Sequence, residues 1–397
     1  MKRISIVLTV IIGSIGFLFF TPAPGFSGFS GFSGFSNGNA TVNESLIIVS
    51  GPTHREMSGK FLDDTLIEDL SFGGKLAEVL KPSVKSRTWL IDPSVIEEII
   101  DMSDGYTVLP KVKGAGEEIA AQFLVDLKYA IGNDPVYALP YGSPKISTRK
   151  KFSDVEFSQL QSVSSVRLAR ALGRAVTAGA PPNWNETPQK LSSMNIAEFR
   201  TLRKQLALIS QVSNDLVISE TAIRLNTLLN PKLDKKSSQY LAVSFTGAVN
   251  RLAEKLRVLP GRYTLTSREE KLPVTIVNDF DAPAQVVLTL KANNSRILSI
   301  EDRALYLQPN SRTQVLVPVK SIASGKVELQ AQLETLRGTK YQGISTLAVT
   351  IAVIGPIVGW VMAIAGTLLI GAAGTRIFRR VRKARATGAT GNGSGDK

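Results

Sequence analysis

Apolar and polar positions alternate in three ways along this chain, and each way predicts a different kind of structure. Residues 46–139 mix short apolar runs with helical spacing, residues 153–257 repeat apolar positions every three or four residues, and residues 262–354 alternate with a period of two. Apolar runs between helices predict a parallel sheet, whereas alternation predicts half-buried strands. The pattern therefore predicts an α+β multidomain protein.

The first region, 44–150, predicts strands and helices in turn. Its apolar runs predict the strands 46–50, 88–91 and 136–139, and its helical spacing predicts the helices 61–80, 95–102 and 117–131. A βαβαβ order implies a parallel sheet with right-handed crossovers. We expect a truncated parallel α/β domain, either barrel-like or Rossmann-like.

The middle region, 151–260, is predicted to be helical. The predicted helices are 155–178, 196–212, 215–229 and 238–256. This pattern leaves open whether the region is a separate bundle or continues the α/β domain.

The next region, 261–354, holds short alternating segments separated by polar turns. The predicted strands are 263–266, 274–277, 284–290, 297–299, 304–307, 313–319, 326–333 and 347–354. Strands of this length and spacing are typical of an immunoglobulin-like β-sandwich.

The segment after the sandwich has no charged residue from Gly355 to Thr375. A helix of that length can cross a bilayer. The cations that follow it are Arg376, Arg379, Arg380, Arg382, Lys383 and Arg385. Cations beside a membrane helix favour the cytoplasmic side. We expect a transmembrane helix over 355–375, a cytoplasmic tail over 376–397, and a single-pass protein of the cell membrane with an extracellular ectodomain.

The other end of the chain has the layout of a secretory signal. Lys2 and Arg3 precede the apolar run 4–20. We expect residues 1–24 to be a signal peptide or an N-terminal anchor. Residues 25–43 begin with four copies of Gly-Phe-Ser and are predicted to be a linker.

Composition excludes several kinds of chemistry. The net charge is +14, but more than half of it lies in the signal and the tail, so nucleic acid is not an expected partner. The chain has no cysteine and one histidine. Disulfides and thiolate sites are therefore excluded, and a metal site or catalytic triad would have at most one imidazole. We expect no metal, no cofactor and no enzymatic activity.

Four residues follow the predicted strands at one edge of the sheet, where open parallel sheets bind ligands. They are His54, Asp92, Tyr141 and Ser143. They predict a ligand crevice. The alternative is structural: Asp92 caps the helix that begins at Pro93, and Tyr141 lies in a turn.

Small residues recur at every fourth position in the predicted membrane helix. The central members are Gly359, Ala363, Thr367 and Gly371. Small residues at this spacing allow a second membrane helix to approach closely. They predict a helix contact, although glycine and alanine are common in membrane helices generally.

Several blocks resemble a family of actinobacterial exported membrane proteins of uncharacterised function. The blocks are WLIDP at 89–93, ALPYGSP at 138–144, PGRYTLTS at 260–267 and LPVTIVN at 272–278. Family members are typically encoded beside the flippase for lipid-linked peptidoglycan precursor, so the resemblance implies that flippase as a partner. The chain departs from the family where Ser143-Pro144-Lys145 replaces a usual aspartate, and its α/β region looks shortened.

We therefore expect a non-enzymatic cell-envelope protein that serves as an accessory or scaffold for precursor export or wall assembly. The alternative is a carbohydrate-binding or degenerate carbohydrate-active domain on an immunoglobulin-like stalk, with a wall glycan in the crevice.

Overall fold

The computed structural model describes most of the chain. The described residues are 45–83, 86–144, 152–181, 184, 191, 193–294, 297–299, 302–341, 343–352 and 357–387. The predicted signal over 1–24, the linker over 25–43 and the tail beyond residue 387 lie outside them.

Four parallel strands form the sheet of the α/β region. They are β1 (Ser45–Val49), β2 (Arg87–Ile91), β5 (Val136–Ala138) and β6 (Thr177–Ala178), and they lie side by side in that order. The predicted parallel sheet is confirmed. Strand β6 was not predicted, because the helix expected to reach residue 178 ends earlier, at the left-handed Gly173.

One face of this sheet packs against helices. These are α1 (Leu66–Leu70), α2 (Lys75–Glu78), α3 (Pro93–Ser103), α4 (Glu117–Ile131) and α5 (Asp154–Leu172). Alternate strand residues, such as Val49, Trp89 and Val136, enter one apolar core with them. When each right-handed crossover leads to the next strand in the same direction, the connecting helices all lie on the same face of the sheet. The described strands follow one another in chain order without a reversal, so the winding runs in one direction across this sheet.

The helix predicted over 61–80 is wrong as one element. It is interrupted after α1 because Gly73 has a positive φ of 84° and a Cβ on Gly74 would lie 2.0 Å from the carbonyl oxygen of Glu68. A small unpredicted hairpin, β3 (Thr107–Val108) with β4 (Val112–Lys113), lies between α3 and α4.

The middle region is helical, as predicted. Its elements are α6 (Ser193–Ile209), α7 (Leu216–Arg224), the 3₁₀ helix η2 (Leu225–Leu229) and α8 (Lys235–Glu254). Asp215 caps α7 and Asp234 caps α8 through their carboxylates. The predicted helix 238–256 is corrected at its end, because the chain becomes extended at Leu256 and enters the sandwich directly.

The sandwich contains two sheets. Its strands are β7 (Leu256–Val258), β8 (Gly261–Leu265), β9 (Glu269–Asn278), β10 (Ala284–Ala292), β11 (Ile297–Ser299), β12 (Arg303–Leu307), β13 (Ser311–Ser321), β14 (Gly325–Glu334) and β15 (Ser345–Ile351). One sheet has the order β12-β10-β14-β15-β8 and the other β11-β13-β9-β7. Alternate residues point into the core, as along β13. Two facing sheets agree with the predicted immunoglobulin-like architecture.

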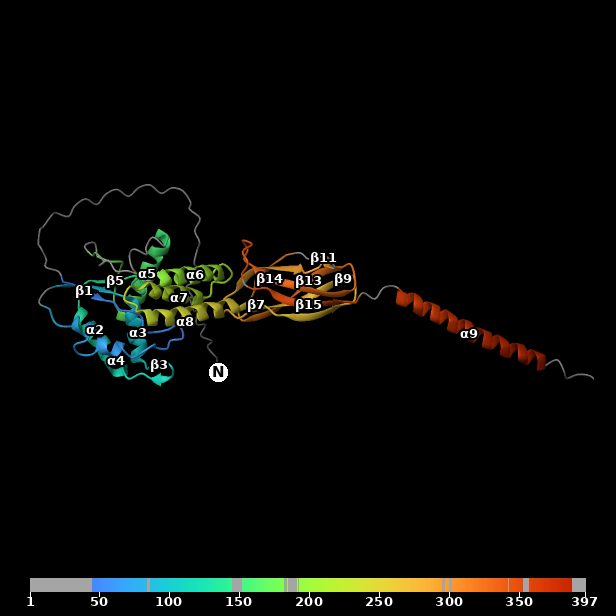
Figure 1. Cartoon of the computed structure of the whole chain (residues 1–397), viewed down its shortest axis with the longest axis horizontal. Helices are drawn as coiled ribbons and strands as arrows, with labels where there is room; N and C mark the ends of the chain where they lie inside the picture. The colour runs from blue at the N-terminus through green and yellow to red at the C-terminus, as the bar shows by residue number, and fades with distance from the viewer. Residues whose placement is uncertain are drawn as a thin grey trace, which may run out of the picture.

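Helices and sandwich share one apolar core, which we call the apolar joint. Phe245 of α8, Leu256 of β7 and the fully buried Phe280 belong to the same cluster. Backbone bonds add to it: the Gln285 N–H donates to Val212 O at 2.8 Å. We call α6, α7, η2 and α8 the helical body. Figure 1 shows α8 running into the sandwich, so the helical body and the sandwich form one elongated unit.

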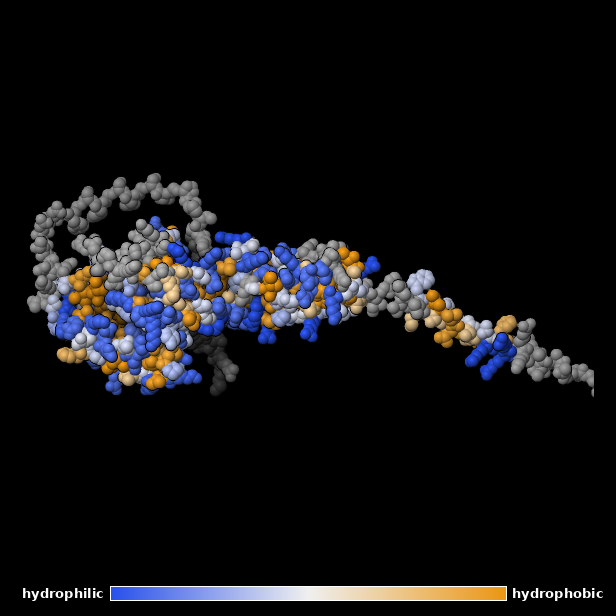
Figure 2. Space-filling model, in the orientation of Figure 1, coloured by the Kyte–Doolittle hydropathy of each residue, from blue (hydrophilic) through white to orange (hydrophobic). Residues whose placement is uncertain are grey.

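Helix α9 (Ile357–Thr387) follows the sandwich and extends beyond its far end (Figure 1). Within the described residues, no helix combines the length and the apolar character needed to cross a membrane. Figure 2 shows apolar residues over the first part of α9 and strongly hydrophilic ones near its end.

Candidate functional site

Asp92 lies at the centre of the predicted crevice and is fully buried. Its carboxylate accepts from the backbone and the hydroxyl of Ser94 at 2.9 and 2.8 Å. It also accepts from Gly142 N–H at 3.1 Å and from the Ser143 hydroxyl at 2.7 Å. The structure thus brings Asp92 and Ser143 together, as parts of a helix cap that also holds the turn after β5.

Tyr141 lies beside them but points elsewhere. Its hydroxyl donates to Glu97 at 2.8 Å, and Arg167 both bonds Glu97 at 2.7 Å and lies over the tyrosine ring at 5.3 Å. The Tyr141 N–H donates to Ser164 of α5 at 2.9 Å. Burial, together with the Glu97 charge, raises the pKa of Tyr141, which therefore remains a neutral hydrogen-bond donor.

His54 is not brought to Asp92. Its Nδ1 lies 3.1 Å from Asp63, and its backbone N–H donates to Glu98 at 2.9 Å. Burial lowers the pKa of His54, but the hydrogen bond to Asp63 and nearby carboxylates outweigh it, so the pKa is raised. The same pair holds the pKa of Asp63 well below its usual range, with the His54 hydrogen bond as the largest cause.

Helical residues that the sequence did not single out cover this edge of the sheet. The Asn230 amide donates to Gly51 O at 2.8 Å and to Gly142 O at 3.0 Å. A Cβ on Gly142 would lie 2.7 Å from the backbone nitrogen of Thr227. Lys232 donates to Ser50 O at 2.9 Å, and burial lowers its pKa. We call this contact between the sheet edge and the helices the polar junction.

Asp92 is a weaker acid than an ordinary aspartate because it is buried at the polar junction. Burial is the largest cause and raises the pKa of its carboxyl to about 6, while the bonds from Ser143, Ser94 and Gly142 oppose it. The buried groups here bond one another, so their arrangement fits the structural alternative of capping and turns. Asn230 could have been suspected from its position before Pro231, where asparagine commonly forms turns.

Charged residues of α3 bond the segment that follows β1. Thr53 donates to the buried Glu98, and Arg55 pairs with Asp101. Arg224 of α7 donates to Glu56 O at 2.8 Å, and burial, followed by the charge of Arg55, lowers its pKa. In the described part of the chain, no group of three or more His, Cys, Asp or Glu residues could hold a metal ion.

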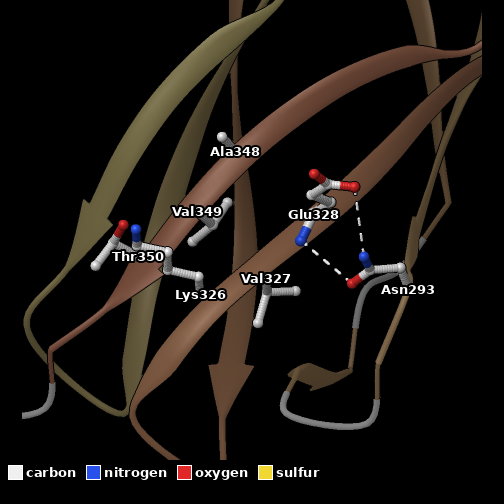
Figure 3. Close-up of a pocket in the computed structure, with 7 residues that line it drawn as sticks. All are labelled: Asn293, Lys326, Val327, Glu328, Ala348, Val349 and Thr350. Atoms are coloured by element: carbon white, nitrogen blue, oxygen red, sulfur yellow. Dashed lines mark hydrogen bonds between the residues drawn. The ribbon is translucent and has the colours of Figure 1, made fainter.

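Two cavities lie away from the predicted residues. One, of about 330 Å³, lies on the sandwich against β14 and β15, where the Asn293 amide approaches Glu328 and Lys326 lines the rim (Figure 3). The other, of about 270 Å³, lies between α6 and α8 and is also lined by Tyr341. Neither is lined by His54, Asp92, Tyr141 or Ser143.

A family described as "Family of unknown function (DUF6049)" matches residues 145–388. The chain belongs to this family. The DUF6049 match covers α5 to α9 and the whole sandwich, and begins after β5. The shared part is thus the helical body, the apolar joint, the sandwich and the final helix.

The matches to solved structures each cover about a quarter of this chain. No curated protein matches the sequence. Among solved structures, WR4, a C. elegans MSP family member, is 11% identical, with a TM-score of 0.20 over 25% of this chain and 98% of that one. The trypsin-activated alpha-2-macroglobulin of Escherichia coli is 22% identical, with a TM-score of 0.20 over 24% of this chain and 7% of that one. The E. coli chaperone DraB is 13% identical, with a TM-score of 0.19 over 25% and 57%.

The small residues of the DUF6049 helix α9 lie on its surface. Ala363, Thr367 and Gly371 are exposed, and Gly359 lies one turn earlier in the helix. The Thr367 hydroxyl donates to Ala363 O at 2.9 Å, so it is satisfied within the helix. This leaves a face of small groups with no described residue against it.

Proposed function

We propose that this DUF6049 protein is a non-enzymatic, single-pass cell-envelope scaffold that holds a binding body at a fixed orientation relative to the membrane. The apolar joint is the observation that carries the proposal. Because α8 continues into β7 and one core includes Phe245, Leu256 and Phe280, the body cannot swing freely on the sandwich. A rigid connection suits a protein that positions partners.

The membrane part of the proposal rests on the sequence. The run from Gly355 to Thr375 is uncharged, and the cations from Arg376 to Arg385 follow it. We propose that this run inserts with the basic tail on the cytoplasmic side. Extraction of membranes at alkaline pH should retain the chain, and a tag after Lys397 should resist external protease; release or cleavage would contradict insertion.

The partner part of the proposal rests on the resemblance noted above. We propose that the helix docks beside an integral membrane protein of wall synthesis, the peptidoglycan-precursor flippase in the first instance. The face of Gly359, Ala363, Thr367 and Gly371 would supply the close contact, because small residues let helix backbones approach.

Crosslinking in intact cells followed by capture of the full chain and mass spectrometry tests this role. The wild-type chain should recover the flippase, and Gly359→Leu with Ala363→Leu should lose it. A matched control is Ala365→Leu with Ala372→Leu, which adds similar bulk to the opposite side of α9. Normal capture by the first variant would contradict helix docking.

The carbohydrate alternative makes a different prediction in the same experiment. It requires ligand to reach groups that now bond each other, such as Asp92 with Ser143 and Tyr141 with Glu97. We place it second for that reason. Capture of wall glycan by the wild type, without any membrane partner, would reverse the order.

A further inference from the structure

We propose that the free edge of β1 is a dimer interface, at which two copies of this chain pair their β1 strands antiparallel across a twofold axis. Among the described strands, β1 lies at one end of the sheet order and pairs with β2 alone. Figure 2 shows an apolar patch over β1, at the end of the α/β region away from α9.

Part of the β1 backbone directs its hydrogen-bonding groups away from β2. Ser45 N–H donates to Ser86 O at 3.1 Å, and Val49 O accepts from Asp92 N–H at 2.9 Å. Backbone groups in a parallel ladder alternate in direction, so Leu46 and Ile48 direct their N–H and C=O groups away from β2. In the described part of the chain, no residue bonds to these groups.

The side chains of the same two residues are apolar and accessible. Leu46 is 39% exposed and Ile48 is 43% exposed. They lie on the face opposite the helices, because Ile47 and Val49 enter the helix-covered core. The described crossover helices pack on the face of Ile47 and Val49, so none of them covers Leu46 and Ile48.

The remaining edge strands are protected in a way that β1 is not. Arg257 lies in β7, Arg262 in β8 and Arg303 in β12, whereas β6 and β11 are only two and three residues long. Charged residues and short strands are how sheet edges avoid pairing with other chains. The sequence of β1, SLIIV, has no charge and no proline, which fits an edge that is paired.

A second copy fits this short edge because the edge is self-complementary. In a twofold antiparallel pair centred on Ile47, Leu46 of each copy faces Ile48 of the other. These two residues then exchange both N–H···O bonds, and all of the outward groups of both strands are satisfied. Their side chains become cross-strand neighbours on one face.

The test is the mass of the purified full chain in detergent, measured by sedimentation over a range of concentrations. We expect a dimer whose dissociation constant rises at least about tenfold in Leu46→Lys and in Ile48→Pro. Proline at position 48 removes only an outward N–H, so the β1–β2 bonds and thermal unfolding should be unchanged. Val243→Lys, at a 74% exposed position of α8, is the matched control and should dimerise normally.

Three results would overturn the proposal. A monomeric wild type at every concentration would do so, as would a dimer that the β1 variants leave intact, since that dimer would form elsewhere, such as along α9. A monomer that dimerises only after residues 1–44 are deleted would show that the chain's own N-terminal segment occupies the edge instead.

Discussion

The polar junction and the apolar joint connect the same helical body to its two neighbours by opposite means. At the junction, Asn230 and Lys232 of the helical body donate hydrogen bonds to the backbone of the sheet edge, beside the buried Asp92. At the joint, Phe280 and Leu256 lie in a continuous core. The stability that comes from apolar burial is largely independent of pH, whereas the stability that comes from a buried carboxylate changes with pH. The joint should therefore be weakened by loss of buried volume, and the junction by loss of a hydrogen-bonding group or by ionisation of Asp92.

Truncation at the joint should have the largest effect. Phe280→Ala removes a fully buried ring and should lower the free energy of unfolding by about 4 kcal/mol, because a cavity remains in the core. Denaturation followed by fluorescence measures this. Phe72→Ala, at a fully exposed position, is the control and should change stability by less than about 0.5 kcal/mol. Equal effects at both positions would contradict the assignment of the joint.

Truncation at the junction should cost somewhat less. Asp92→Ala should lower stability by about 3 kcal/mol at pH 5, because it leaves the donors of Ser94, Gly142 and Ser143 without an acceptor. The matched control is Asp234→Ala, which removes an exposed helix cap and should cost about 1 kcal/mol. If the two losses were equal, Asp92 would act only as a cap.

The junction should also be sensitive to pH. The pKa of Asp92 is raised from 3.8 to about 6, so the folded state binds the proton more tightly than the unfolded state. The stability from this group is complete below pH 3.8 and is lost as pH rises to 6, by at most about 3 kcal/mol. Denaturation of the wild type and Asp92→Ala from pH 3.5 to 7 should show the difference between them shrinking. A constant difference would contradict the raised pKa.

The smallest expected effect concerns His54. Its pKa is raised, so its pairing with Asp63 stabilises the fold below pH 6.5 and is lost as pH rises through the folded pKa. Asp63 is 41% exposed, so solvent weakens the pair and His54→Gln should cost no more than about 0.5 kcal/mol. Denaturation at pH 5.5 and pH 9 checks this; a loss that persisted at pH 9 would come from packing.

Sequence patterns predicted the parts of this fold that depend on local periodicity. The strands around Ile48, Leu90 and Tyr137 and the alternating β-sandwich are of this kind. They did not predict the interruption at Gly73 or the end of α5 at Gly173, because a glycine's backbone angle depends on its surroundings. They also could not show that the helices share a core with the sandwich, since that depends on contacts distant in the chain.

In the candidate site, too, the sequence predicted the local interaction but not the contacts between distant parts of the chain. The cap formed by Asp92 before Pro93 is local and was foreseen as an alternative. Covering of the strand ends by Asn230 and Thr227 was not, because these residues lie far along the chain from Gly142. His54 lies against Asp63, which is nine positions along the chain, and this pair was not predicted.

Hydrogen exchange with mass spectrometry on the wild type and Phe280→Ala tests most directly whether the body and the sandwich are one unit. If they are, the substitution should lower protection by a similar free energy in α6, in α8 and in β9, while Phe72→Ala changes none of them. Loss of protection confined to the sandwich strands, with α6 and α8 unchanged, would contradict the rigid connection on which the proposed scaffold role depends.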